Sequence, residues 1–464
     1  VNGTWVEDEA RFDVFDPATG QLVASVADLD VAATARAVDA AHAAGHNWAA
    51  MTGKERAAIL RRWHDLMIEN ADDLATILTA EMGKPWAEAR GEILYGASFI
   101  EWFAEEAKRI YGDVIPGHQR DKRIMVLKQP VGVVGSITPW NFPNAMITRK
   151  AGPALASGCA FVARPAAETP LSALALGVLA ERAGIPHGVF SVIPSSRSSE
   201  IGKEFCENPK VRKLTFTGST EVGKMLAVQC AGTMKQLSME LGGNAPFIVF
   251  DDADLDNAVK GAISGIFAAT GQTCIAGSRL LVQNKIHNEF VDKLVAFAKT
   301  AEMGDPMSLD TQIGPVTTMP QFEKILSYLD VAKDEGAECV LGGARAERPE
   351  CGDGWFVEPT IFTGVRNDMR IAQEEVFGPV LSVIPFKDDD EAVEIANDVV
   401  YGLAAGVWTS SINRTLEIFF IFPEIAVVEV HKIYAIRFQV FQGTFHVMSH
   451  SAYLVPVILI ALIP

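Results

Sequence analysis

Residues 131–143 have the sequence VGVVGSITPWNFP, a β-branched run followed by a loop with two prolines. The run at 131–137 has the composition of a short buried strand, and the proline-rich loop begins where this run ends. Helix-like sequence at 145–157 comes next. A strand, a loop and a helix in this order are typical of a parallel sheet whose strands are connected by helices.

The same alternation continues toward the C-terminus, with Gly and Pro at the joins. The expected strands are 159–163, 211–216, 246–250, 279–283 and 338–341, and the expected helices are 170–183, 220–231, 254–266, 288–301, 319–335 and 390–397. We therefore predict an α/β fold with two doubly wound parallel-sheet lobes, joined near residues 240–275. On the N-terminal side, residues 31–110 carry apolar side chains at helical spacing and predict a run of amphipathic helices.

The composition limits the classes of function. A chain of 464 residues with 49% hydrophobic content is too long for one simple domain. The formal net charge of −18 argues against nucleic acid and anionic membranes as partners, because both require clustered Lys and Arg. The six cysteines form no CxxC pair and no metal-ligand spacing with histidine, which favours a reducing, cytoplasmic compartment and no metal site. The first residues show no basic segment before an apolar run, so no secretion signal is expected.

The sequence GQTC, residues 271–274, places a cysteine in a Gly-led loop before an expected strand. Such a cysteine is either an activated thiolate, which needs a lowered pKa and access, or a small buried apolar side chain. The second interpretation suits Cys159, Cys206 and Cys230, which have apolar neighbours. Cys274 is the candidate nucleophile.

The sequence MELGGNAP, residues 239–246, puts Glu240 between apolar neighbours and ahead of two glycines. Burial of a carboxylate raises its pKa, and a raised pKa is what a general base needs near neutral pH. The alternative is a glutamate at a strand end that points to water.

The loop TPWNFP, residues 138–143, lies where open α/β sheets bind ligands, at the carboxyl end of a strand. The Asn141 amide is able to hold an oxyanion there. The alternative is a proline-rigid turn with Trp140 and Phe142 packed beneath it.

The sequence FTGSTEVG, residues 216–223, is a second strand–turn–helix segment. The N–H groups of a helix N-terminus attract phosphate, and Gly218 lets it approach the backbone. The spacing matches neither the dinucleotide fingerprint nor the Walker loop, so an ordinary helix start capped by Ser219 is the alternative.

With EEVFGP at 374–379, these motifs occur in the order found in the aldehyde dehydrogenase superfamily, which the chain resembles from about residue 1 to 417. The resemblance implies that Cys274 attacks the aldehyde carbonyl to form a thiohemiacetal. It implies that Asn141 and the Cys274 backbone N–H hold the oxyanion, and that Glu240 activates the water that hydrolyses the resulting thioester.

The resemblance also implies a cofactor, NAD or NADP. The expected cofactor-binding residues are Trp140, Arg164, Gly218, Ser219, Glu375 and Phe377, with Glu375 on the nicotinamide ribose. At Arg164 the family usually has a Lys that contacts the adenosine ribose. Ala167 offers no carboxylate to repel a 2′-phosphate, which leaves NADP open.

The same resemblance implies the domain organisation. Residues 1–110 and 131–240 would form a discontinuous cofactor-binding domain, and 241–417 a catalytic domain. A hairpin at 111–130 would form an oligomerisation arm together with the C-terminus, so that the protein would be a homo-dimer or homo-tetramer.

Residues 91–262 are most similar to succinate-semialdehyde dehydrogenases, notably in NAMITRK at 144–150. This implies that Arg149 grips a substrate carboxylate, with a helix-packing arginine as the alternative. Those enzymes have a second arginine where this chain has Ala268, so an aldehyde dehydrogenase of broader substrate range is the competing interpretation.

Residues 418–464 are apolar and lack the family's C-terminal motifs, and we assign them no role. A shifted reading frame or an altered terminus would explain the change. An inactive structural or binding relative is therefore an alternative of another class, although the complete set of Cys274, Glu240 and Asn141 favours an active enzyme. A cysteine protease is disfavoured because no histidine accompanies Cys274 in a hydrolase pattern.

Overall fold

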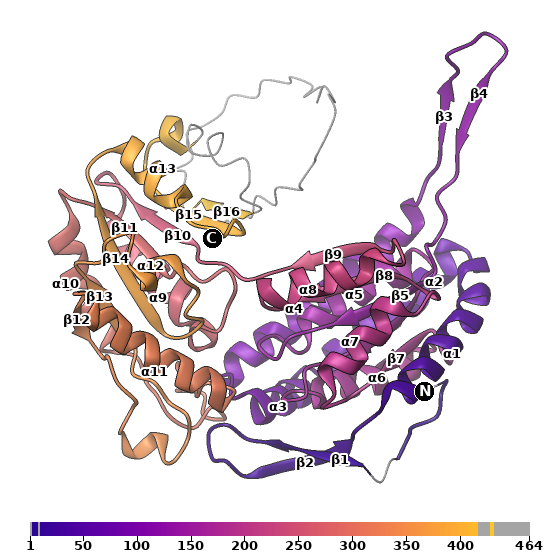
Figure 1. Cartoon of the computed structure of the whole chain (residues 1–464), viewed down its shortest axis with the longest axis horizontal. Coiled ribbons are helices and arrows are strands. Elements are labelled where there is room, and N and C mark those ends of the chain that lie inside the picture. Colours follow the sequence, from indigo (N-terminus) through magenta and orange to yellow (C-terminus); the bar gives the residue numbers. More distant parts are fainter. Residues whose placement is uncertain (1, 8–9, 416–426, 431–464) are drawn as a thin grey trace. The chain divides into compact units, whose positions relative to one another are not determined.

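The computed structural model describes residues 2–7, 10–415 and 427–430 (Figure 1). The chain forms two compact units. Unit 1 comprises Val1–Leu241, Gly304–Thr318 and Glu350–Gly354, and unit 2 comprises Gly242–Met303, Met319–Pro349 and Trp355–Pro464. Two short segments from the second half of the chain thus belong to unit 1.

The centre of unit 1 is a five-stranded sheet of order β7-β6-β5-β8-β9 in which every neighbouring pair is parallel. Buried apolar side chains from both faces of the inner strands explain the near-continuous hydrophobic runs in the sequence. The strands are β5 (Val133–Ile137), β6 (Ala160–Arg164), β7 (Phe190–Val192), β8 (Val211–Thr217) and β9 (Gln236–Glu240).

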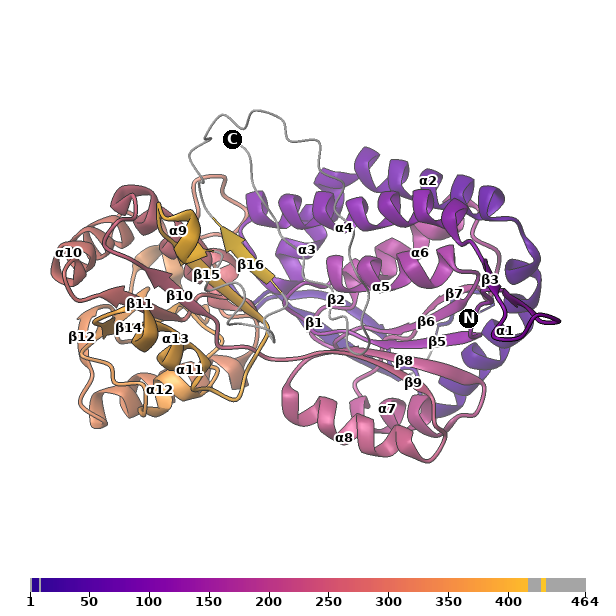
Figure 2. The same cartoon turned by 90° about the horizontal axis from the view of Figure 1, so that it is seen from above.

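Helices cover both faces of this sheet, as a doubly wound fold requires. In Figure 2, α4, α5 and α6 lie on one face and α7 and α8 on the other. The helices of unit 1 are α1 (Val31–Ala50), α2 (Gly53–Glu69), α3 (Ala71–Met82), α4 (Trp86–Glu106), α5 (Ala145–Ala156), α6 (Leu171–Ala183), α7 (Ser198–Glu207) and α8 (Thr220–Ala231).

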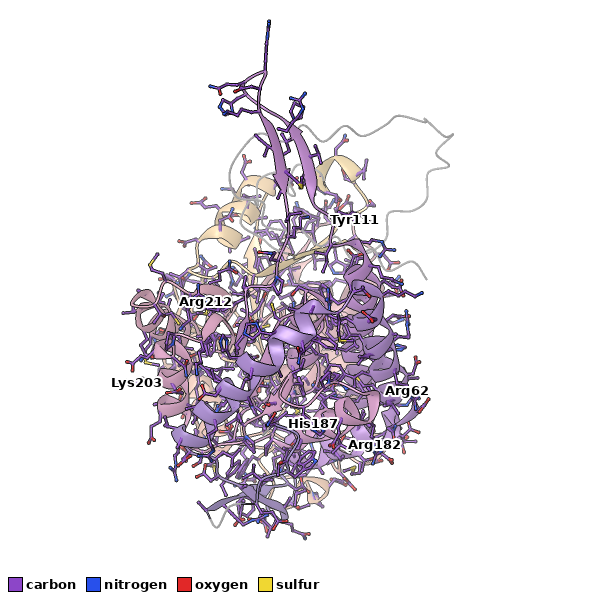
Figure 3. The ribbon with its side chains drawn as sticks, turned by 90° about the vertical axis from the view of Figure 1, so that its right-hand side faces the viewer. Arg62, Tyr111, Arg182, His187, Lys203 and Arg212 are labelled. Atoms are coloured by element: carbon purple, nitrogen blue, oxygen red, sulfur yellow. The ribbon has the colours of Figure 1, made fainter. Side chains whose placement is uncertain are left out.

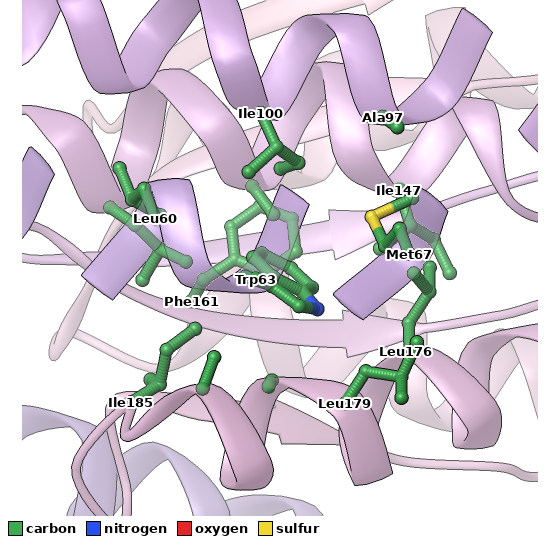
Figure 4. Close-up of a cluster of buried hydrophobic side chains, with 14 of the residues drawn as sticks. Leu60, Trp63, Met67, Ala97, Ile100, Ile147, Phe161, Leu176, Leu179 and Ile185 are labelled. Atoms are coloured by element: carbon green, nitrogen blue, oxygen red, sulfur yellow. The ribbon is translucent and has the colours of Figure 1, made fainter. Parts of the chain in front are cut away.

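The larger core cluster of unit 1 joins α2 to the sheet (Figure 4). The side chain of Trp63 is fully buried and meets the ring of Phe190 edge-on, with 5.3 Å between ring centroids. Helix α2 begins with a capping box between Thr52 and Glu55, and its apolar residues face this cluster. The predicted amphipathic helices are confirmed, and each such buried aromatic stabilises the unit by about 2–3 kcal/mol through apolar burial.

Two hairpins complete unit 1. The first pairs β1 (Arg11–Phe15) with β2 (Leu22–Ala27), and the second pairs β3 (Asp113–Pro116) with β4 (Arg123–Val126). The β3–β4 hairpin projects from unit 1 beyond Tyr111 (Figure 3), and all eight of its strand residues are exposed.

Unit 2 contains a seven-stranded sheet of order β12-β13-β14-β11-β10-β15-β16. It is parallel except at one edge, where β12 runs antiparallel to β13. The strands are β10 (Pro246–Val249), β11 (Arg279–Gln283), β12 (Glu338–Leu341), β13 (Thr360–Thr363), β14 (Val380–Phe386), β15 (Ala404–Trp408) and β16 (Val427–Val430). The helices are α9 (Leu255–Phe267), α10 (His287–Ala298), α11 (Met319–Asp334), α12 (Arg370–Gln373) and α13 (Asp389–Asn397).

The predicted α/β class and the expected strands are confirmed, each strand within two residues of its expected ends. Strand β16 lies inside residues 418–464, the segment to which we assigned no role from the sequence. It pairs in parallel with β15 at the edge of the sheet. The remainder of 418–464 lies outside the described residues. Within the described ranges, no helix combines the length and the apolarity needed to cross a membrane.

Candidate active site

In unit 1, the candidate residues gather at one edge of the five-stranded sheet, because parallel strands place their carboxyl ends together. The register pairs Ile137 with both Arg164 and Phe216, and it pairs Thr217 with Glu240. The loops that carry Trp140 and Asn141, and Gly218 and Ser219, begin at this same edge. The structure thus brings together all the candidates of unit 1 that follow a strand.

Glu240 is the last residue of the edge strand β9. The three residues at the start of β9 are exposed, whereas the Glu240 side chain is half-buried. Its backbone carbonyl accepts a hydrogen bond from the Gly218 N–H at 3.1 Å, which ties the end of β9 to the turn before α8. Glu240 therefore lies at a strand end, as the alternative interpretation expected. Its side chain does not point fully into water, because it is half-buried.

Asn141 is buried, and its backbone carbonyl accepts a hydrogen bond from the Lys84 amine at 2.9 Å. Trp140 packs partly against the large core cluster, as the turn-packing alternative expected. One side of the TPWNFP loop is thus packed against the protein. A second basic side chain, Lys150 of α5, donates to the hydroxyl of Thr217 at the end of β8, at 2.5 Å.

Ser219 is the N-cap of α8, and its hydroxyl accepts a hydrogen bond from the Val222 N–H at 3.4 Å. The capped helix start is therefore present. Gly218 leaves room for a neighbouring ring, because a Cβ atom there would lie 2.5 Å from the Phe216 side chain. The first turn of α8 follows directly on the carboxyl end of β8, the edge at which doubly wound folds bind ligands.

Arg164, at the end of β6, is buried, and burial lowers the pKa of its guanidinium. It donates to the carbonyl of Ser195 at 2.9 Å and to the hydroxyl of Ser198, the first residue of α7. Its Nε atom is buried with no hydrogen-bond partner within the described ranges. The guanidinium thus bonds to the segment that leads into α7, at the carboxyl end of β6.

In unit 2, Cys274 lies in the loop between a 3₁₀ turn (Ala268–Gly271) and β11, and it is half-buried. Ala269 and Thr270 have positive φ angles of 50° and 57°, which costs non-glycine residues about 1–3 kcal/mol each. Such strain is typical of functional loops. By contrast Cys206 is buried in the core of unit 1, and burial raises the pKa of its thiol to about 12.

Three of the motifs meet around Cys274 inside unit 2. A Cβ atom at Gly243 would lie 2.3 Å from the Cys274 carbonyl oxygen, and one at Gly271 would lie 2.0 Å from the carbonyl oxygen of Gly378. Glycine is therefore required at both positions. The cysteine loop is enclosed by the Gly-Gly segment on one side and by the EEVFGP loop on the other.

The EEVFGP loop is held by several side chains. The carboxylate of Glu375 accepts a hydrogen bond from the Gly243 N–H at 3.0 Å, and burial raises its pKa. The amine of Lys324 on α11 donates to the Glu375 carbonyl at 2.9 Å. Gln321 donates to the carbonyls of Val376 and Phe377 at 2.9 and 3.0 Å.

Arg149 lies on α5, where it is half-buried and packs against the Phe99 ring at 5.5 Å and the sulfur of Met146 at 3.9 Å. These contacts match the helix-packing alternative and leave part of the side chain accessible. Ala268 is exposed at the end of α9.

Sequence reasoning missed the charged side chains that hold the two loops, Lys84 under Asn141 and Lys324 under Glu375. Lysines are usually exposed, so their number and spacing give no sign that these two donate to backbone carbonyls. The Gly83 and Pro85 neighbours of Lys84 are turn-forming residues, and this signal could have placed Lys84 between two helices.

The model of the aldehyde dehydrogenase family matches residues 5–432 of this chain. The chain belongs to this family. Glutarate-semialdehyde dehydrogenase of Pseudomonas aeruginosa is 51% identical over 90% of this chain and 86% of its own length. The NADP-dependent succinate-semialdehyde dehydrogenase of Escherichia coli is 50% identical over the same shares.

Among solved structures, succinate-semialdehyde dehydrogenase from Burkholderia pseudomallei has a TM-score of 0.90 at 49% identity, covering 94% of this chain and 89% of that one. This aldehyde dehydrogenase is thus an oxidoreductase that oxidises aldehydes with NAD or NADP. The family match ends at residue 432, so it extends 432 − 417 = 15 residues beyond the limit inferred from the motifs and includes β16. An inactive relative is not supported.

Proposed function

We propose that this aldehyde dehydrogenase oxidises a small aldehyde that has an anionic group at its far end. The proposed reaction is the oxidation of succinate semialdehyde to succinate. The observation that carries the proposal is the identity of 50–51%, over most of both chains, to enzymes named for succinate semialdehyde and glutarate semialdehyde, which both have a carboxylate at the far end. Arg149 supports it, because this half-buried residue follows the TPWNFP loop and a guanidinium suits a carboxylate. On this proposal the enzyme acts in γ-aminobutyrate catabolism.

In the proposed reaction the Cys274 thiolate forms a C–S bond to the aldehyde carbon. The carbonyl oxygen becomes an oxyanion, which accepts hydrogen bonds from the Asn141 amide and the Cys274 backbone N–H. The nicotinamide supplies a hydride acceptor, so the thiohemiacetal carbon is oxidised to a thioester. Glu240 then takes a proton from water, whose oxygen attacks the thioester carbon, and the C–S bond breaks to release the acid.

The residues assigned to the cofactor fall into two groups. Trp140, Arg164, Gly218 and Ser219 surround the carboxyl-terminal edge of the unit 1 sheet, which is where doubly wound folds bind nucleotides. Glu375 and Phe377 lie on the rigidly held loop of unit 2. We propose that NADP is accepted as well as NAD, because Ala167 carries no carboxylate to repel a 2′-phosphate.

We further propose that the enzyme is a homo-oligomer in the cytoplasm. The exposed apolar residues of the β3–β4 hairpin support assembly, since Val114 is 78% and Met125 71% exposed. A reducing compartment suits a reactive thiolate and a chain whose six cysteines, all within the described ranges, form no disulfide.

The test is reduction of NAD⁺ or NADP⁺, followed at 340 nm, with a panel of aldehydes. We expect kcat/KM to be highest for succinate semialdehyde and abolished by Cys274→Ala. Cys339→Ala is the matched control, because Cys339 is also half-buried and should leave the rate unchanged. An unchanged rate in Cys274→Ala refutes the nucleophile. Equal kcat/KM for propanal and succinate semialdehyde refutes the narrow substrate and favours the broader enzyme that Ala268 suggested.

A further inference from the structure

A buried ion pair lies directly beneath the TPWNFP loop. Lys84 and Glu92 each have side chains only 1% exposed, and the amine of Lys84 contacts the Glu92 carboxylate. The same amine donates to the backbone carbonyl of Asn141 at 2.9 Å and lies 3.7 Å from the centre of the Phe142 ring. A buried charge is stable only where it is paired and hydrogen-bonded. Here Glu92 pairs with the Lys84 amine, and the Asn141 carbonyl of the loop accepts its hydrogen bond.

Glu92 holds the other end of the loop. Its Oε1 atom accepts hydrogen bonds from the N–H groups of Asn144 and Ala145, at 3.0 and 3.1 Å. These are the first amides of α5, so the carboxylate caps that helix while its second oxygen pairs with Lys84. The chain from Asn141 to Ala145 is thereby fixed at both ends by one ion pair.

The position of Lys84 is itself fixed. Gly83 ends α3 with a φ of 82°, and a Cβ atom there would lie 2.5 Å from Pro315 and 2.8 Å from Pro17. The turn between α3 and α4 is therefore closely packed. It places Lys84 so that its buried amine reaches the Asn141 carbonyl.

We propose that Lys84 is a positioning residue for the oxyanion, acting through Asn141, with Glu92 as its counterion. The inference rests on the proposed role of the Asn141 amide. A hydrogen bond from a buried cation to the Asn141 carbonyl fixes the backbone at that residue. The side-chain amide of Asn141 is then oriented before the substrate binds. A donor that is already oriented stabilises an oxyanion without reorganisation.

The test is a double-mutant cycle on the intact enzyme with Lys84→Met and Asn141→Ala, measuring kcat/KM for the best aldehyde and the melting temperature. Lys84→Met alone should lower kcat/KM by about ten- to hundredfold, a part of the loss typical of an oxyanion donor. In the Asn141→Ala background the same substitution should lower it by less than about twofold. The Kd for NADP should not change in either variant.

Lys235→Met is the matched control, because Lys235 is also a buried lysine of unit 1 whose amine donates to a backbone carbonyl, that of Asn208, at 3.1 Å. It should leave kcat/KM within about twofold of wild type. If the Lys84→Met variant does not fold, the double variant with Lys84→Met and Glu92→Gln takes its place in the cycle. This double variant removes both buried charges, so neither is left unpaired.

The outcomes separate two failures. If Asn141→Ala alone leaves kcat/KM unchanged, the proposed oxyanion role is wrong, and the inference falls with it. If Asn141→Ala lowers kcat/KM strongly and the Lys84 and Asn141 losses multiply, the oxyanion role stands and the inference about Lys84 is overturned.

Discussion

The amine of Lys324 donates a hydrogen bond to the backbone carbonyl of Glu375. A lysine of α11 thus fixes the backbone of the glutamate proposed to bind the nicotinamide ribose, and burial lowers the pKa of that lysine. In each unit, therefore, a lysine side chain holds the main chain of a candidate site residue.

Lys324→Met should raise the KM for NAD or NADP by about three- to tenfold with a smaller change in kcat, which corresponds to the loss of a hydrogen bond worth about 1 kcal/mol. Lys333→Met is the control, since Lys333 lies on the same helix and donates to the Gly343 carbonyl at 2.8 Å. Initial-rate kinetics at varied cofactor concentration measure both. Equal KM values in the two variants would contradict the prediction.

Arg149→Met should raise the KM for succinate semialdehyde by tenfold or more, because a charge-assisted contact to a carboxylate is worth about 1.5–3 kcal/mol. The KM for propanal, which has no carboxylate, should stay within about twofold. Measuring both substrates on one variant separates recognition from packing. A parallel rise for the two aldehydes would show that Arg149 only packs against Phe99.

The stability of the enzyme should depend on Glu81. Burial raises the pKa of this carboxyl to about 8 from an unfolded value of 4.5. Between these values the folded state holds a proton that the unfolded state has lost, so the free energy of unfolding falls as pH rises through this window. Below about pH 4.5 both states are protonated, and above about pH 8 both are ionised, so the contribution is flat outside it.

Glu81→Gln removes this titration, because glutamine remains neutral at every pH. We expect the melting temperature of wild type to fall more between pH 5 and about pH 8 than that of the variant. Differential scanning calorimetry at closely spaced pH values measures the difference. Parallel curves for the two proteins would mean that Glu81 is ionised throughout.

The β3–β4 hairpin should determine assembly. Val114→Asp should shift the protein toward the monomer, because a charge on an apolar interface is costly to bury. Val228→Asp is the control: Val228 is 77% exposed on α8, similar to Val114 at 78%, but lies outside the hairpin. Light scattering coupled to size-exclusion chromatography reports the mass. An unchanged mass for Val114→Asp, or a monomeric wild type, would count against the arm.

Most strands that the sequence predicted, such as β5 and β11, have side chains buried on both faces, although the more exposed β12 was also predicted and the buried β13 and β15 were not. Sequence reasoning missed β9 because Gln236 and its neighbours on this edge strand are exposed and polar, and it missed β14 because Pro385 interrupts an otherwise apolar run. The motifs located the candidate residues at strand ends and in the cysteine loop. They could not show that Arg164 already bonds to the Ser195 carbonyl, because that contact joins separate parts of the chain.

The near-contact between Gly271 and Gly378 has a consequence for engineering new substrate ranges. Any side chain introduced at Gly271 would meet the carbonyl of the EEVFGP loop, so a library that varies Gly271 without changing that loop would mostly yield disrupted proteins. The two loops have to be redesigned as a pair. Positions whose side chains are exposed are better sites for varied residues in such a library. Ile275, next to the nucleophile, is one of them.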